Sequence, residues 1–260
     1  MRVALGIEYD GTSFNGWQSQ PDGASVQDAL ERALAAIAGT PTRVTAAGRT
    51  DRGVHAAMQV VHFDTDARRP LTAWVRGVNA HLPDSVAVLW SVAVAPEFHA
   101  RFSAMRRHYT YLLADRPARP GLFAHRVGWH HRALDVTAMQ EAARALVGTH
   151  DFSAFRAAEC QAKSPVKTLV QLDITRVGEL VRFDFCADAY LHHMIRNIVG
   201  SLVQVGGGKV PSSWIGELLE GRDRTRAAGT FAPQGLYFTG VEYPEQCGLT
   251  DTRRSPTLIA

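Results

Sequence analysis

The sequence predicts an α+β protein made of two halves that share one order of secondary structure: strand, helix, strand, strand, helix, strand. Stretches in which apolar and polar residues alternate indicate strands, and apolar residues at helical spacing indicate helices. This order occurs twice along the 260 residues, and a hydrophobic content of 46% is ample for a core. Each half must cover one sheet face with helices, so we expect the sheets to join and to leave a cleft between the halves.

The first half begins with alternation over residues 2–9, which predicts a strand. Ser25 followed by Asp28 is typical of a helix start, and Gly39 marks the end of that helix. The other elements expected in this half are strands at 42–47 and 58–63, a helix at 71–82 and a strand at 86–94.

The second half repeats this order without repeating the sequence. We expect strands at 108–113, 166–177 and 180–186, helices at 136–147, 192–205 and 212–220, and a closing strand at 236–241. The chain therefore divides into an N-terminal half at 1–103 that carries the candidate catalytic loop, a C-terminal half at 104–244 that completes the cleft, and a flexible tail at 245–260.

Composition excludes several classes of protein. No stretch approaches the roughly 18 uncharged apolar residues that a membrane helix requires, so we expect a cytoplasmic protein with no membrane partner. Three widely spaced cysteines indicate reduced thiols rather than disulfides or a metal knuckle. The net charge of +3 is mildly basic, but arginine and histidine gather at 101–108, 125–132 and 222–226, which suits a polyanionic partner.

The segment 47–56, AGRTDRGVHA, holds one carboxylate between two arginines and two glycines. Gly48 and Gly53 permit a tight backbone that would present Asp51 between two strands. The flanking arginines favour the ionised acid, as a nucleophile or base needs. The structural alternative is an aspartate that accepts hydrogen bonds within a turn and is neutralised by a neighbouring arginine.

Two further segments contain residue types that suit an RNA site. Tyr109 and Tyr111 lie two residues apart on a predicted strand and so point to one face, where they would stack on a base extruded from an RNA stem. A core strand is the alternative. Arg196 lies among apolar residues of a predicted helix, where an arginine usually requires a carboxylate such as Asp51; a solvated arginine is the alternative.

His192 and His193 are adjacent in the sequence. Adjacent residues of a helix face different directions, whereas two histidines that chelate a metal from one helix usually stand four residues apart. We therefore do not expect this pair to bind a metal.

Taken together, these segments resemble the tRNA pseudouridine synthase A family along nearly the whole chain. GRTDRGVHA at 48–56 resembles the catalytic loop of the family, although Arg52 stands where a small residue is more usual. Residues beyond about Glu245 have no family counterpart. Further family signatures lie at 9–18, 25–27, 107–111, 150–156, 164–166, 194–200 and 232–237.

The resemblance implies the pseudouridine synthase fold, with two ferredoxin- or RRM-like βαββαβ halves and a mixed, mainly antiparallel sheet. It implies an isomerase that converts uridine to pseudouridine at positions 38, 39 and 40 of the tRNA anticodon stem-loop, with no cofactor and no metal. The C1′–N1 bond breaks, the uracil turns and C5 joins C1′, after the nucleotide is flipped out of its stem. The implied partners are tRNA and a second copy in a homodimer, and no DNA.

Five residues receive roles from the resemblance. Asp51 would supply the essential carboxylate, either as a nucleophile or as a base through a glycal-like intermediate, and Arg196 would hold it ionised. Tyr109 would stack on the target uracil, and Leu236 would pack beneath the ring. Arg49 would fill the space left by the flipped nucleotide or hold its phosphate.

Two other classes of protein remain open. A non-catalytic RNA-binding protein or RNA chaperone would use the same arginines and tyrosines, but an acid in a phosphate-facing loop would gain it nothing. A metal-dependent hydrolase would draw on the eleven histidines. It requires a bound equivalent of zinc, which metal analysis of the purified protein would detect.

Overall fold

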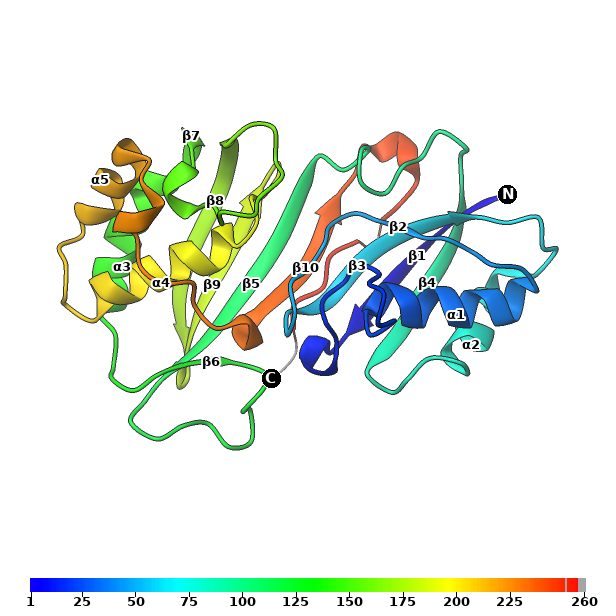
Figure 1. Cartoon of the computed structure of the whole chain (residues 1–260), viewed down its shortest axis with the longest axis horizontal. Helices are drawn as coiled ribbons and strands as arrows, with labels where there is room; N and C mark the ends of the chain where they lie inside the picture. Colours follow the sequence, from blue (N-terminus) through cyan, green and yellow to red (C-terminus); the bar gives the residue numbers. More distant parts are fainter. Residues whose placement is uncertain (251, 257–260) are drawn as a thin grey trace. The chain divides into compact units, whose positions relative to one another are not determined.

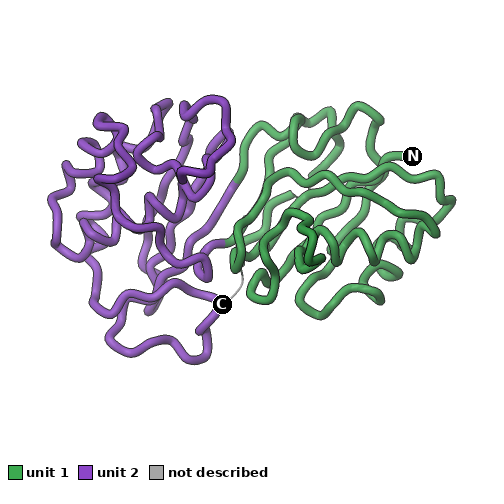
Figure 2. The backbone as a smooth tube through the Cα atoms, in the orientation of Figure 1, with its two compact units in different colours: residues 1–107, 237–260 green, residues 108–236 purple. Residues whose placement is uncertain are grey.

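The computed structural model describes residues 1–250 and 252–256. The chain forms two compact units (Figure 2): unit 1 contains Met1–Arg107 and Tyr237–Ala260, and unit 2 contains His108–Leu236. Within the described residues, no helix is long and apolar enough to cross a membrane.

The sheet of unit 1 contains the strands that the sequence predicts for the first half, together with β10. Its strands are β1 (Arg2–Tyr9), β2 (Thr45–Ala46), β3 (His55–Asp64), β4 (Val86–Val94) and β10 (Leu236–Glu242). The order is β4-β1-β3-β10, and β2 also pairs with β3. The pairs β1–β3, β1–β4 and β2–β3 are antiparallel, whereas β10 and β3 are parallel.

Two helices, α1 (Val26–Ala38) and α2 (Leu71–Asn79), lie side by side along the sheet of unit 1 (Figure 1). The predicted helix start is confirmed, because the Ser25 hydroxyl accepts a hydrogen bond from the Asp28 N–H while Asp28 accepts one from the Ser25 N–H. Gly39 ends α1 with a φ of 75°, a conformation that favours glycine. The core of this unit includes Leu5, Ile7, Leu30, Leu34, Phe63 and Trp74.

Unit 2 has its own sheet in the order β5-β9-β8-β7, with β6 paired to β5. Its strands are β5 (Arg106–Asp115), β6 (Gly128–His130), β7 (Gly148–Asp151), β8 (Val166–Val177) and β9 (Leu180–Ala187). Its helices, which gather beside β8 and β9 in Figure 1, are α3 (Val136–Ala143), α4 (Met194–Gly206) and α5 (Trp214–Gly221). The α+β class and a mixed, mainly antiparallel sheet are thus confirmed. Unit 1 contains the predicted βαββαβ order, whereas unit 2 contains the additional strands β6 and β7.

The structure differs from the sequence prediction in several short elements. The strand expected at 42–47 contains only the two residues of β2, and the helix expected at 136–147 is α-helical only to Ala143 before a 3₁₀ turn. Strands β6 and β7 were not predicted, because three or four residues carry too little alternation to be recognised.

The division of the chain also differs from the predicted one. The sequence assigns the closing strand to the C-terminal half, but Tyr237 onward belongs to unit 1, because β10 pairs with β3 there, with Tyr237 opposite His55. Part of the expected flexible tail contacts the same unit. Arg254 donates to Glu8 across 2.9 Å, and its backbone N–H donates to the Thr239 carbonyl across 2.8 Å. Residues 251 and 257–260 of that tail lie outside the described residues.

Candidate active site

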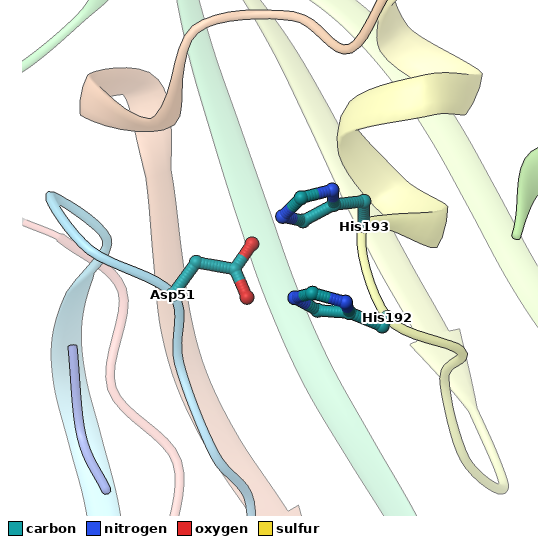
Figure 3. Close-up of side chains that lie close together, drawn as sticks. All are labelled: Asp51, His192 and His193. Carbon is teal, nitrogen blue, oxygen red and sulfur yellow. The ribbon is translucent and has the colours of Figure 1, made fainter. Parts of the chain in front are cut away.

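Asp51 lies in the loop that connects β2 to β3, and Figure 3 shows its side chain projecting from that loop. The loop turns directly after Asp51, where the Val54 N–H donates to the Asp51 carbonyl across 3.1 Å. Gly53 has a φ of 76°, which a side chain would strain. The carboxylate is only partly buried, so the predicted placement of an accessible acid between two strands agrees with the structure.

The beginning of the loop is fixed by one buried side chain of β3. The Gln59 amide donates to the Gly48 carbonyl across 2.7 Å and accepts from the Gly48 N–H across 3.3 Å. A Cβ atom on Gly48 would lie 2.9 Å from the ring of Phe238 on β10. Glycine is therefore required here for close packing, in addition to the turn that the sequence indicates.

The N-terminal segment 9–17 packs against the other side of the loop. The Tyr9 hydroxyl lies 2.8 Å from Thr50 Oγ1, and the Trp17 N–H donates to the Thr50 carbonyl across 3.0 Å. Gly16, with a φ of 91°, comes so close that a Cβ atom would lie 2.8 Å from the same carbonyl. The residue next to the candidate catalytic acid is thus held by both its side chain and its backbone.

His55 fixes the end of the loop, where β3 begins. It is 1% exposed, and its ring stacks on Tyr237 with centroids 4.8 Å apart. Its Nδ1 lies 3.1 Å from the Gly11 N–H and 3.0 Å from the Asp10 carboxylate. An unprotonated Nδ1 accepts from Gly11 and a protonated one donates to Asp10, so either state ties the loop to the N-terminal segment.

The two arginines beside Asp51 are exposed. Neither Arg49 nor Arg52 forms a hydrogen bond or ion pair through its side chain within the described part of the chain. The structural alternative, in which one of them neutralises the acid, is therefore not what the structure shows. Two unpaired guanidinium groups beside a carboxylate are suited to contacts with phosphate.

In unit 2, Tyr109 and Tyr111 lie two residues apart on β5, the strand on which they were expected. Tyr109 is 8% exposed and meets Tyr190 edge to face, with ring centroids 5.0 Å apart. Tyr111 is fully buried, and its hydroxyl donates to the Ala232 carbonyl across 2.8 Å. The core alternative therefore holds for Tyr111, whose role is to position the segment before β10.

Arg196 and Leu236 also lie beside that segment. The Arg196 Nε–H donates to the Phe231 carbonyl across 2.9 Å, and the Phe231 N–H donates to the Arg196 carbonyl across 3.2 Å. Leu236 is 5% exposed, and the preceding Gly235 lies so close to the Leu112 carbonyl that a Cβ atom would stand 2.4 Å from it. Strand β5 and helix α4 thus both hold the segment 231–236, which ends in Leu236.

The histidine pair differs from its prediction. Helix α4 begins at Met194, and His193 adopts a left-handed conformation with a φ of 61°. The rings of His192 and His193 consequently lie together, with centroids 3.9 Å apart, instead of facing different directions (Figure 3). Two imidazoles that lie this close together are potential metal ligands.

The structure adds positioning residues to the predicted site. Tyr9 and His55 lie within the sequence motifs, but the sequence assigns them no role. The partner of Tyr9 is the side chain of Thr50, which is distant in sequence, and the partner of His55 is the backbone N–H of Gly11. A glycine-rich segment at 11–16 beside a glycine-bracketed acid was the available signal of close backbone packing.

Residues 6–103 and 142–244 match a family model described as tRNA pseudouridine synthase. A protein of Thiobacillus denitrificans named tRNA pseudouridine synthase A is 60% identical over 252 residues, which cover 97% of each chain. One of the same name from Chromobacterium violaceum is 63% identical over 250 residues, covering 96% of this chain and 95% of that one. A third, from Dechloromonas aromatica, is 60% identical over 251 residues and 96% of each chain.

The family model matches most of the chain, and the relatives align along almost its full length. Both findings agree with the fold and with the loop that presents Asp51. The chain belongs to the tRNA pseudouridine synthase family, whose members are isomerases.

Proposed function

We propose that this enzyme isomerises uridine to pseudouridine at positions 38, 39 and 40 of the tRNA anticodon stem-loop, with Asp51 as its essential carboxylate. The observation that carries the proposal is the loop around Asp51. A partly exposed acid stands in a loop that is hydrogen-bonded through the backbone of Gly48 and Thr50 and through the imidazole of His55. Catalysis needs a reacting group that is held in place before the substrate arrives.

Asp51 acts on the target nucleoside, either as a nucleophile at C1′ or as a base that removes the C2′ proton to give a glycal-like intermediate. The C1′–N1 bond breaks, the uracil rotates and C5 bonds to C1′, while C5 loses its proton and N1 takes up a proton. Reaching this bond requires extrusion of the nucleotide from its stem, at a cost of a few kcal/mol. The exposed Arg49 supports the proposal, because an unpaired guanidinium beside the acid can hold a phosphate of the extruded nucleotide.

Tyr109, Arg196 and Leu236 serve the same nucleotide from unit 2. Tyr109 stacks on the uracil, Leu236 packs beneath it, and Arg196 is the counter-ion of the Asp51 carboxylate. The packing within unit 2 supports this assignment, because the strand that carries Tyr109 and the helix that carries Arg196 both bind the segment that ends in Leu236.

The test is tritium release from tRNA labelled at C5 of uracil. Wild type should release tritium, and Asp51→Asn should fold, bind tRNA and release none, because the amide keeps the shape of the side chain without its nucleophilicity or basicity. Asp66→Asn is a matched control, since it makes the same change at an exposed aspartate of the same unit. Turnover near the wild-type rate in Asp51→Asn would exclude Asp51 as the essential group.

Mapping the modified nucleotides tests the assignment to positions 38, 39 and 40. RNA binding without tritium release from wild type would favour the alternative, a non-catalytic RNA-binding protein or RNA chaperone. We further propose a cytoplasmic homodimer whose substrate is tRNA and not DNA. Sedimentation of the protein with and without tRNA measures the oligomeric state, and competition with DNA of equal length measures the preference for RNA.

A further inference from the structure

Unit 2 carries a run of basic residues with no acid among them. Between Asp115 and Asp135 the chain contains four arginines, three histidines and no aspartate or glutamate. We call residues Arg116–Arg132 the basic strip. It comprises the loop after β5, strand β6 and the turn that follows β6.

The acids that flank the basic strip are bound to other groups. Asp115 accepts two hydrogen bonds from Arg176, at 2.8 and 2.7 Å, and a third from the Leu134 N–H. Asp135 caps α3 by accepting from the Ala138 N–H. Arg116 pairs with Glu179 at 2.7 Å, so neither of the flanking acids compensates the charge of Arg119 or Arg132.

Two arginines of the strip are available to a ligand. Arg119 and Arg132 are exposed, and neither forms a side-chain hydrogen bond or ion pair among the residues that the structure describes. The backbone beneath them is ordered: β6 pairs with β5 from Leu113 to Asp115, and the Trp129 indole N–H donates to the Arg116 carbonyl across 2.8 Å. The indole of Trp129 remains 39% exposed.

The basic strip adjoins the segment that ends in Leu236. A Cβ atom on Gly235 would lie 2.7 Å from the backbone nitrogen of Gly128, the first residue of β6. In Figure 1 the loop before β6 extends away from the sheet of unit 2, while β6 itself runs beside β5. Strand β6, within the basic strip, therefore lies beside the segment that ends in Leu236, the residue proposed to pack beneath the uracil.

From this arrangement we infer that the basic strip binds the phosphates of the RNA backbone next to the target uridine, with Arg119 and Arg132 as contact residues. The inference rests on the proposed function and adds a substrate-binding surface to it. Unpaired arginines with an exposed indole match a phosphate backbone with unstacked bases.

The experiment compares two double variants of the full-length protein. Arg119→Ala/Arg132→Ala removes the two contact residues, and Arg144→Ala/Lys209→Ala removes two exposed positive charges of unit 2 outside the strip. For each we would measure kcat and KM for tritium release, and the Kd of fluorescently labelled tRNA at several salt concentrations.

The strip variant should raise KM and Kd about five- to tenfold at low salt, since each exposed ion pair contributes up to about fivefold. The slope of log Kd against log salt should fall by about two, one for each lost phosphate contact. The kcat at saturating tRNA should stay unchanged, and the control variant should behave as wild type.

Unchanged Kd and salt slope in the strip variant would overturn the inference, as would an equal loss in the control variant. A change in sedimentation of the strip variant without RNA would also overturn it and would assign the strip to a contact between copies. If wild type released no tritium, the proposed function would fail, whereas the Kd measurements would still decide whether the strip binds RNA.

Discussion

Replacing Tyr9 by phenylalanine removes one hydroxyl group from the contact that holds the loop of Asp51. Tyr9 is 4% exposed, and burial raises the pKa of its hydroxyl despite hydrogen bonds to Thr50 and Gln59 that lower it. The hydroxyl is therefore neutral and links Thr50, beside the acid, to Gln59, which binds Gly48. Its loss leaves buried polar atoms with fewer partners, which costs about 1–3 kcal/mol of unfolding free energy.

The effect on catalysis should exceed the effect on folding. A loop that has lost this contact no longer holds Asp51 in one place, and a misplacement of about 1 Å can reduce the rate about 100-fold. We expect Tyr9→Phe to lower kcat for tritium release by about 10- to 100-fold. KM for tRNA should change little, because Tyr9 is buried and does not reach the RNA.

Tyr243→Phe is the matched control. Tyr243 is also buried in unit 1, and its hydroxyl donates to the Ala100 carbonyl across 2.7 Å. Tyr243→Phe removes the same atom and should lower the free energy of unfolding, measured with urea, by a similar amount. Its kcat should remain within about twofold of wild type. A wild-type kcat in Tyr9→Phe, or an equal decrease in both variants, would refute the positioning role of Tyr9.

Two further predictions concern Arg196 and His62. Arg196→Ala should lower both kcat and the melting temperature, because it removes the proposed counter-ion and the hydrogen bond to Phe231. Arg196→Lys should recover part of the activity, because it restores the positive charge. An unchanged kcat and melting temperature in Arg196→Ala would show that Arg196 is an ordinary surface residue. Burial, then the charges of Arg2 and His99, lower the pKa of His62 to about 4. As the pH falls, His62 therefore binds a proton at a higher pH in the unfolded chain than in the folded one. The free energy of unfolding should consequently fall by about 3 kcal/mol between pH 6.5 and 4. Urea unfolding across this pH range should show that the free energy of unfolding of His62→Asn depends less on pH than that of wild type.

Most regular elements could be predicted because their signals are local. The helix from Val26 to Ala38 has apolar residues at helical spacing, a capping pair at its start and a glycine at its end, and all three act within one segment. The acid at Asp51 could be identified for the same reason, since its glycines and arginines are its neighbours in the chain.

Pairing across long sequence distances could not be predicted. Strand β10 follows the helices of unit 2 in sequence, but it pairs with β3 in unit 1, and no local pattern specifies the partner of a strand. The left-handed His193 is a second example. A favourable helical pattern continues through it, and only the structure shows that the helix begins at the next residue.

Both ends of unit 1's chain support the loop of Asp51. The N-terminal segment supplies Tyr9, while β10 supplies Phe238 against Gly48 and Tyr237 against His55. Between the end of β3 at Asp64 and the start of β10 at Leu236 lie 171 residues, so the loop cannot reach its final packing until nearly the whole chain has been made. Local signals place the acid at the end of a strand, but its rigidity, on which the proposed catalysis depends, is a property of the completed fold.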